Sequence, residues 1–441
     1  MDDLIKFDYP TEIPRLIKVV GVGGGGGNAV TKMYDEGYRD VSYVLCNTDA
    51  QALKRSTIPN RVQLGLTGLG AGGRPEVGRT LAEESFDKIK NMLSDGTQMV
   101  FITAGMGGGT GTGASPVVAR IAKEMNILTI GIVTIPFMFE DKFKIVQALK
   151  GVEAIKENVD ALLVINNERL IDLCSDMSLP EAFNKADDTL SIAARSISEI
   201  ITIPGYINLD FADVKTILKD GGVAVMSSGL GKGDNRVSQA IKAALDSPLL
   251  NNNDVFKAKK ILFNISFGNI LPMKTKELIE IQNFMAKFDS EIEVIWGTAF
   301  DENLVDEIKI TILASGYSIE NIISINKEIK EEPIITADKD IPYQLSEKDQ
   351  IKIEQEERNK RERKLIEKYY GKGALRQIGK EARPHPFIFT SENIDDNFTI
   401  EEVINNPAFN RSSRVMIEIA RKAEKKRQEI EEGEEELKTK N

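Results

Sequence analysis

Apolar runs alternate with helix-like stretches between Leu16 and about Met138, and this alternation constrains the fold more than any other feature of the sequence. The runs are rich in β-branched residues and read LIKVVGVG, VSYVLCN, MVFITAG and LTIGIVTI. Between them, apolar residues recur with the period of a helix that packs on one face. The order predicts an α/β class with a Rossmann-like parallel sheet that is covered by helices on both faces.

A glycine-rich loop, GVGGGGGN, follows the first apolar run directly and spans Gly21 to Asn28. Glycines let the backbone approach a phosphate closely, and a helix N-terminus offers amide donors and the positive end of a dipole. Asp49 follows about 20 residues later, where a dehydrogenase holds its ribose-binding acid. This loop by itself favours an NAD(P)-dependent oxidoreductase.

A second glycine-rich loop, GGGTGTG at Gly107 to Gly113, reverses that preference. It follows the apolar run MVFITAG and precedes a helical pattern that Ser115 and Pro116 open. A nicotinamide enzyme needs one such loop, whereas two loops on neighbouring strands would face one ligand from two sides. The hydroxyls of Thr110 and Thr112 also suit a polyphosphate and its cation.

The sequence resembles the tubulin/FtsZ family from Leu16 to about Gly316. The second loop matches the glycine motif of that family, and the segments NTDAQAL, GLGAGG, PEVGR and NLDFADV follow the family's order. The resemblance implies a GTPase with GTP/GDP and Mg²⁺ as cofactors.

Carried over by position, the resemblance implies phosphate contacts from both glycine loops. These positions are Gly23, Gly24, Gly25, Gly26 and Gly27, and Gly107, Gly108, Gly109, Thr110, Gly111, Thr112 and Gly113. Ala71, Gly72, Gly73 and Asp49 would lie near the γ-phosphate and the metal ion, with Asp49 as the metal ligand.

The nucleoside contacts implied by the resemblance come from later segments. Glu140 would bond the ribose, Phe183 would stack on the base, and Asp187 with Asn28 and Asn167 would recognise the guanine edge. A carboxylate can accept from both guanine N–H groups at once. Phe183 and Asp187 lie on one face of a predicted helix, so both can reach one base, although a core Phe and a solvated Asp would give the same pattern.

Three positions depart from the family pattern. Lys144, also expected at the site, stands where an Arg is usual, Arg74 replaces an Asn, and Asn166 replaces a Pro before Asn167. Because Lys lacks the planar bidentate geometry of Arg, a filament protein that binds GTP with little hydrolysis is an alternative function.

A long helix is predicted from Ser178, which can cap while Glu181 reaches back, to about Ile203 before Pro204-Gly205. Two carboxylates, Asp210 and Asp213, follow this helix in a motif that begins at Asn208. Helix capping alone would explain both carboxylates. The resemblance instead implies that Asn208, Asp210 and Asp213 complete the nucleotide site of the next subunit, in a heterologous contact that builds head-to-tail filaments.

Changes of composition divide the chain into six expected segments. They are an N-terminal extension at 1–14, a GTP-binding domain at 15–177, a central helix at 178–204, a mixed α/β C-terminal activation domain at 205–326, a charged linker at 327–400 and a C-terminal peptide with a charged tail at 401–441. The linker has no wide apolar face, which predicts disorder or a solvated helix.

The amino-acid composition argues against several classes of protein. A net charge of −11 argues against a protein that coats nucleic acid or an anionic membrane. With Cys46 and Cys174 as the two cysteines and His385 as the single histidine, the body of the chain lacks the residues for cysteine-based metal sites or histidine catalysis. No apolar run approaches the roughly 20 residues of a membrane span, so we expect a cytoplasmic protein without direct membrane insertion.

The resemblance also implies partners and a location. The filament would form the division ring in bacterial cytokinesis, so the chain would lie at the division site. The segment NPAFNR, at Asn406 to Arg411, partly fits a docking peptide for division proteins and membrane-tethering adaptors.

Overall fold

The computed structural model describes residues 16–38, 40–170, 177–247, 255–317, 347–371 and 374–378, and residue 400. The expected extension at 1–14, the peptide at Asn406 to Arg411 and the charged tail lie outside the described residues. Among the described helices, none combines the length and apolar character that crossing a membrane requires.

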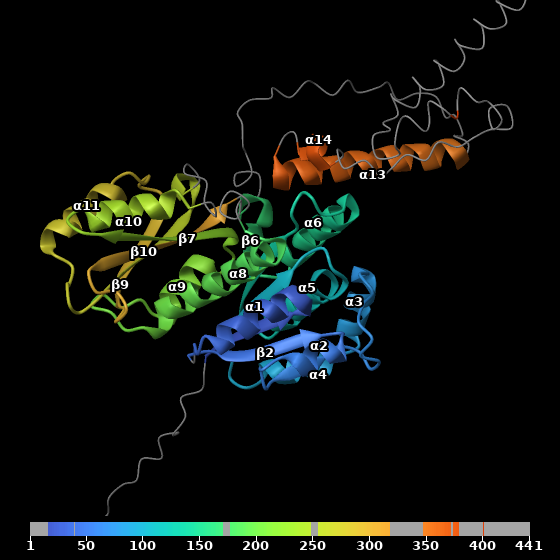
Figure 1. Cartoon of the computed structure of the whole chain (residues 1–441), viewed down its shortest axis with the longest axis horizontal. Coiled ribbons are helices and arrows are strands. Elements are labelled where there is room, and N and C mark those ends of the chain that lie inside the picture. Colours follow the sequence, from blue (N-terminus) through green and yellow to red (C-terminus); the bar gives the residue numbers. More distant parts are fainter. Residues whose placement is uncertain are drawn as a thin grey trace, which may run out of the picture. The chain divides into compact units, whose positions relative to one another are not determined.

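The described strands form one ten-stranded sheet, in the order β3-β2-β1-β4-β5-β6-β7-β10-β8-β9 (Figure 1). The strands are β1 (Ile17–Val22), β2 (Ser42–Asn47), β3 (Arg61–Gln63), β4 (Met99–Gly105), β5 (Leu128–Ile135), β6 (Ala161–Asn166), β7 (Gly222–Lys232), β8 (Lys260–Phe267), β9 (Glu293–Phe300) and β10 (Glu307–Tyr317). The first seven are parallel, whereas β10 runs antiparallel to β7 and β8. The predicted Rossmann-like sheet and the mixed second region are confirmed, and pairing of β6 with β7 makes them one continuous sheet.

The helices connect and cover these strands. They are α1 (Gly23–Asp35), α2 (Ala50–Arg55), α3 (Pro75–Glu83), α4 (Phe86–Leu93), α5 (Gly109–Glu124), α6 (Lys142–Lys156), α8 (Leu179–Thr202), α9 (Phe211–Leu218), α10 (Arg236–Leu245), α11 (Thr275–Met285), α13 (Glu347–Tyr370) and α14 (Ala374–Ile378), with 3-10 turns η1 (Asn167–Leu170) and η2 (Val255–Lys257).

Both faces of the parallel sheet are buried, which explains the continuous apolar runs of its strands. On one face, Val19 and Phe101 of the strands pack with Val30 of α1 and Ile197 of α8 in one core cluster. On the opposite face, strand residues such as Val20 are also fully buried. There α5 and α6 pack over β4 and β5. The carboxyl ends of the strands therefore form a solvent-facing edge between two helical layers, where the glycine loops lie.

The helix predicted after Ser178 is α8, and its capping box is present. The backbone N–H and the hydroxyl of Ser178 both donate to the Glu181 carboxylate, each at 2.7 Å. The helix ends at Thr202, just before Pro204 removes the next backbone donor. Its apolar stripe, which includes Leu190 and Ile197, is fully buried in the core of the parallel sheet.

The expected charged linker contains a structured helix, α13, whose last turn packs on α6. Ile366 is fully buried and Tyr369 is 3% exposed. The expectation that this segment has no face able to pack is therefore wrong for its C-terminal turn. A stripe of three residues, completed by Tyr370, is enough because both tyrosine hydroxyls have hydrogen-bond partners. The hydroxyl of Tyr369 donates to Glu153 of α6, and that of Tyr370 donates to the carbonyl of Pro136.

Candidate nucleotide-binding site

One side of the first glycine loop packs against β4, and the other side faces open space. A Cβ on Gly26 would lie 2.1 Å from the carbonyl oxygen of Thr103 on β4, so only glycine allows this close approach. A Cβ on Gly24 or Gly27 would meet nothing within 4 Å. Val22 precedes α1 without capping it by a side chain. Open space therefore faces a helix N-terminus with unsatisfied amide donors, which is an arrangement suited to a phosphate.

The second glycine loop lies beside the first. Val22 of β1 pairs with Ala104 of β4, so the two loops leave the same edge of the sheet from neighbouring strands. The backbone N–H of Gly107 donates to the Thr112 hydroxyl at 2.8 Å. Gly108 precedes α5 and has open space in the direction of a Cβ. Both loops therefore present helix N-termini toward one region.

Side chains outside the glycine loops hold the loops in place. The side-chain N–H of Gln147 on α6 donates to the carbonyls of Gly73 and Gly107, at 3.0 and 2.9 Å. The hydroxyls of Thr48 and Thr110 lie 2.6 Å apart. The sequence prediction did not include Gln147, although its position one turn after Lys144 on the same helix is a signal that could have identified it.

Asp49 is the N-cap residue of α2. One of its carboxylate oxygens accepts from the backbone N–H groups of Gln51 and Ala52, at 2.8 and 3.2 Å. A β-bridge to Leu69 brings the chain segment of Ala71 beside it. Within the described parts of the chain, no group of three or more acidic, histidine or cysteine side chains could hold a metal ion. Any cation near Asp49 would therefore take most of its ligands from phosphate oxygens and water.

Of the residues expected at the base, Asn167 lies on η1, Phe183 and Asp187 lie on α8, and Asn28 lies on α1. The side-chain carbonyl oxygen of Asn167 is buried and has no hydrogen-bond partner among the described residues. A buried acceptor without a donor is costly, and a guanine N–H would satisfy it. Phe183 is 37% exposed, and its ring meets Phe137 edge to face at 5.3 Å between centroids. Its exposed ring is therefore available to stack on a base.

Asp187 lies one turn beyond Phe183 on α8 and faces α1. The Asn28 side-chain amide donates to its carboxylate at 3.4 Å. Burial raises the pKa of Asp187 to about 6, although Asn28 and Lys32 act in the opposite direction. The carboxylate is thus mostly ionised at neutral pH, which is the state needed to accept two guanine N–H groups.

Glu140 and Lys144 belong to the corner between β5 and α6. Glu140 accepts from the backbone N–H of Phe137 at 3.0 Å and forms an ion pair with Lys144. A second carboxylate, Glu168 of η1, accepts from the backbone N–H of Met138 at 2.7 Å. Glu168 was not among the predicted residues, and it fixes the corner that carries Glu140.

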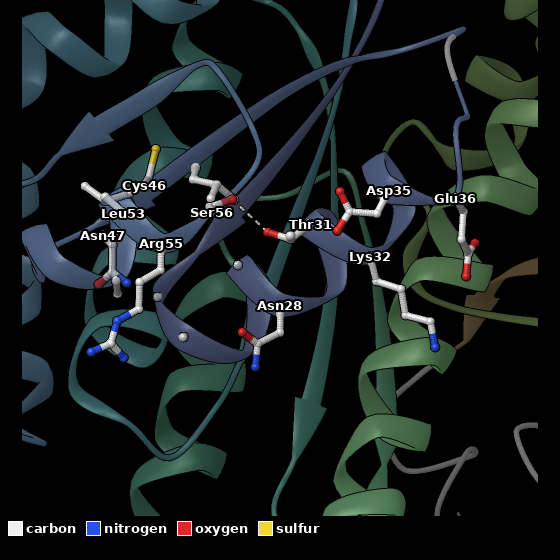
Figure 2. A pocket seen from close by; sticks show the side chains of 15 residues that line it. Asn28, Thr31, Lys32, Asp35, Glu36, Cys46, Asn47, Leu53, Arg55 and Ser56 are labelled. Carbon is white, nitrogen blue, oxygen red and sulfur yellow. Dashed lines mark hydrogen bonds between the residues drawn. The ribbon is translucent and has the colours of Figure 1, made fainter.

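A cavity of about 680 Å³ extends from the first glycine loop along α1 toward α2 (Figure 2). It is lined by Gly24, Gly27 and Asn28 of the predicted site, and also by Thr31 and Ser56, whose hydroxyls lie 3.0 Å apart. The predicted residues of the second glycine loop, the segment Ala71 to Gly73, and Asn167, Phe183 and Asp187 do not line it.

The three predicted catalytic residues lie at the other end of α8 from the glycine loops. Asp210 caps α9 by accepting from the backbone N–H of Ala212 at 2.8 Å, and Asp213 accepts from that of Asp210 at 2.9 Å. Asn208 accepts from Gly205 at 3.4 Å. The helix between the two groups has 24 residues, or about 36 Å at 1.5 Å per residue. Within one chain the structure does not bring these residues to the nucleotide region.

Comparison with known proteins places this geometry in a family. Residues 16–175 match the Tubulin/FtsZ family, GTPase domain, and residues 222–318 match the FtsZ family, C-terminal domain. The chain is 49% identical over 423 residues to the cell division protein FtsZ of Porphyromonas gingivalis, across 95% of this chain and 90% of that protein.

Solved structures agree with this assignment. An empty FtsZ dimer from M. jannaschii superposes with a TM-score of 0.65 at 37% identity, over 72% of this chain and 95% of that chain. A GTPγS-bound protofilament of CetZ2 from Haloferax volcanii gives a TM-score of 0.57 at 19% identity, over 68% and 92% of the two chains, a likeness of fold alone. These matches exclude the NAD(P)-dependent oxidoreductase that the first loop by itself favoured. The chain belongs to the tubulin/FtsZ family of GTPases, within its FtsZ branch.

Proposed function

We propose that this chain binds GTP and GDP with Mg²⁺ at the edge formed by its two glycine loops, and hydrolyses GTP only when a second copy completes the site. The observation that carries the proposal is the position of Asp210 and Asp213, about one α8 length away from the loops. Phosphoryl transfer needs a group that positions the attacking water. The two glycine loops, Gly21 to Asn28 and Gly107 to Gly113, contain no carboxylate for that task, and Asp49 is the one expected to bind the metal ion.

The proposed division of roles follows the chemistry of each group. The amide groups of both loops would hold the phosphates, and Glu140 would accept from a ribose hydroxyl. Phe183 would stack on the base, while Asp187 and the unpaired Asn167 carbonyl would accept guanine N–H groups. The free carboxylate oxygen of Asp49 is available to a metal ion. Bound Mg²⁺ would offset phosphate charge in the transition state.

Head-to-tail assembly would supply the missing carboxylates. Asp210 and Asp213 each use one oxygen in the capping box of α9, which fixes both side chains while leaving their other oxygens available to a neighbouring copy. Such a contact joins two different surfaces and does not close, so it produces filaments. The relative from M. jannaschii forms a dimer, which supports self-association of this chain.

The proposed cellular role is the division ring of bacterial cytokinesis, with the chain in the cytoplasm at the division site. The name of the Porphyromonas gingivalis relative, a cell division protein, supports this role. Division proteins and membrane-tethering adaptors would bind the C-terminal tail, which lies outside the described residues.

One observation favours a second candidate, a filament protein that binds GTP with little hydrolysis. Lys144 stands where the family has an Arg, and it already forms an ion pair with Glu140 in the structure. An ammonium engaged in this way offers the phosphates less than a guanidinium would. The assay below distinguishes the two functions, because the second predicts assembly without turnover.

The test is GTP hydrolysis per monomer across a range of protein concentrations, with light scattering recorded in parallel. We expect the rate to rise above the concentration at which scattering begins. Asp213→Asn keeps a side-chain acceptor for the capping box but removes the charge, so it should bind GTP and assemble with turnover reduced at least tenfold. A rate per monomer that is independent of concentration would contradict a shared site.

A mixing experiment sharpens the test. Gly108→Val should disable the nucleotide site of its own subunit while leaving its Asp213 intact, whereas Asp213→Asn has the opposite defect. Mixed filaments contain some interfaces with both halves intact, so a mixture should hydrolyse GTP faster than either variant alone. Additive rates in a mixture that co-assembles would count against hydrolysis at the interface.

A further inference from the structure

The last turn of α13 is anchored to α6 by a polar cluster. Lys368 and the hydroxyl of Tyr369 both donate to the Glu153 carboxylate of α6, each at 2.7 Å. Burial would raise the pKa of Glu153, but these two donors outweigh it and lower the pKa. Ile366 is fully buried beside them. Figure 1 shows α13 lying along α6, in agreement with the contacts between the two helices.

From this anchor, α13 reaches the corner after β5. The hydroxyl of Tyr370 donates to the carbonyl of Pro136 at 2.6 Å. The next residue, Phe137, donates its backbone N–H to Glu140 and packs its ring against Phe183. Tyr370 therefore holds the segment that orients both the expected ribose acceptor and the expected base-stacking ring.

A second contact holds the corner after β6. The side-chain amide of Asn166 donates to the backbone carbonyl of Tyr369 at 3.1 Å, and its side-chain oxygen accepts from the backbone N–H of Glu168 at 3.0 Å. Asn166 directly precedes Asn167, the residue with the unpaired buried carbonyl. It is also a position where the sequence departs from the family pattern, since the usual proline has no amide to donate.

The two corners are connected to each other. Glu168 accepts from the backbone N–H of Met138 at 2.7 Å, so the segment after β5 and the segment after β6 are bound together as well as to α13. One turn of a helix thus fixes the backbone on the ribose side and the base side of the candidate site. In the part of the chain that the structure describes, the hydrogen bonds of this turn go to Glu153, Pro136 and Asn166 and not to the glycine loops, which lie at β1 and β4.

We propose that the C-terminal turn of α13 is a strap that sets nucleotide affinity, with Tyr370 and Asn166 as positioning residues for the nucleoside half of the pocket. This inference rests on the proposed guanine-nucleotide site. The strap lies beyond residue 318, where the match to the FtsZ C-terminal domain ends. A backbone that is already held in its binding conformation loses less entropy when the ligand binds, which raises affinity without a direct contact.

The location of the strap predicts a specific kinetic pattern. GTP and GDP share the base and the ribose, so loosening the strap should weaken both by the same factor. The phosphate loops and Asp213 are not touched, so kcat at saturating GTP should stay unchanged while KM rises. General damage to the fold would lower kcat as well, which separates positioning from a merely structural role.

The experiment measures dissociation constants of fluorescent GDP and GTP analogues for the full chain and its variants. Tyr370→Phe removes one hydroxyl, and we expect both constants to rise about three- to tenfold, in line with the loss of one hydrogen bond. Asn166→Ala should act similarly. Ile366→Asp, which places a charge in the buried contact with α6, should release the strap and have an effect at least as large as either. Arg361→Ala is the matched control, because its ion pair with Glu357 is exposed on the same helix.

The possible outcomes separate the two proposals. If the unsubstituted chain binds no guanine nucleotide, the proposed function fails. If it binds and both Tyr370→Phe and Ile366→Asp bind equally well, the strap is overturned. Loss of kcat without a change in the dissociation constants, or a rise limited to GTP, would also overturn it. Equal weakening of GTP and GDP, with Arg361→Ala unaffected, would support it.

Discussion

The side-chain amide of Asn28 donates to the Asp187 carboxylate across 3.4 Å and joins α1, the helix of the first glycine loop, to α8. The bond connects the phosphate side of the candidate site to its base side. It also holds in place a carboxylate that burial would otherwise leave protonated more readily. Asp187 is therefore the residue at which nucleotide class can be tested most directly.

Asp187→Asn should weaken GDP binding by at least tenfold, because an amide can accept only one of the two guanine N–H groups and its NH₂ group opposes the other. The measurement is competition between GDP and a fluorescent guanine nucleotide. Glu83→Gln on α3 is the control, since it also removes one carboxylate charge but from an exposed pair with Arg120. Unchanged GDP affinity in Asp187→Asn would contradict guanine recognition by this residue.

The raised pKa of Asp187, about 6, predicts opposite pH effects on binding and on stability. The proposed contact with guanine requires the ionised form, so GDP affinity should fall as the pH drops from 7 to 5. In the chain without nucleotide, between about pH 4 and pH 6, Asp187 keeps its proton in the folded state and has lost it in the unfolded state. Stability contributed by this group is therefore present at low pH and lost as the pH rises through 6.

Asp187→Asn should accordingly raise the melting temperature of the nucleotide-free chain at pH 7 and change it little near pH 4. Titration of the nucleotide's phosphates also affects affinity, so the informative quantity is the pH dependence of the parent minus that of Asp187→Asn. Parallel pH profiles for the two proteins would be inconsistent with the pKa assigned to this carboxyl.

Two glycines of one loop should respond in opposite ways to alanine. Gly26→Ala places a Cβ 2.1 Å from the Thr103 carbonyl, so we expect a loss of stability of about 3 kcal/mol or more. Gly24→Ala has open space and lies in a helix, so stability should stay equal or rise by about 0.5–1 kcal/mol. Its methyl group nevertheless lies in front of the loop, and GTP affinity should fall at least tenfold. Thermal unfolding and nucleotide titration of both variants provide the comparison.

Gln147→Leu should weaken GTP binding about three- to tenfold by releasing the carbonyls of Gly73 and Gly107. The substitution keeps most of the side-chain volume, so the melting temperature should change little. Gln239→Leu, on the distant helix α10, serves as the control in the same titration. Equal affinities for the parent and Gln147→Leu would show that this bridge does not organise the loops.

Arg236→Met should destabilise the second α/β region by about 3–5 kcal/mol, because Arg236 is 1% exposed and bonds Glu277 at 2.8 Å. Burial tends to raise the pKa of Glu277, but the guanidinium outweighs it and lowers the pKa. The stability from this pair is therefore present above the unfolded pKa and is lost as the pH falls below about 4. Lys232→Met breaks an exposed pair with Asp306 and should cost less than about 1 kcal/mol in the same denaturant titration.

Features encoded by neighbouring residues could be predicted from the sequence. The capping box of Ser178 and Glu181 needs only four consecutive residues, and it is present as predicted. The alternation of apolar runs predicted the parallel sheet because both of its faces are buried. The interpretation of Asp210 and Asp213 as helix-capping residues is confirmed within one chain. Their proposed catalytic role depends on a second copy of the chain.

Features that depend on distant residues could not be predicted in this way. The bond from Tyr370 to Pro136 joins positions 234 residues apart, and a charged segment without periodic apolar residues gave no sign of it. Gln147 contacts Gly73 from 74 residues away. Such contacts arise only after the sheet has brought the carboxyl ends of its strands together.

The sequence by itself determined the fold class, the glycine loops and the helix ends, because glycine conformation, capping and hydrophobic period act over a few residues. Only the tertiary structure decided which polar side chains bond to the segments of the candidate site, as the contacts of Gln147, Asn166 and Tyr370 show. The physical reason is that a hydrogen bond depends on the position and direction of both partners, and for partners far apart in the chain the packed core sets these.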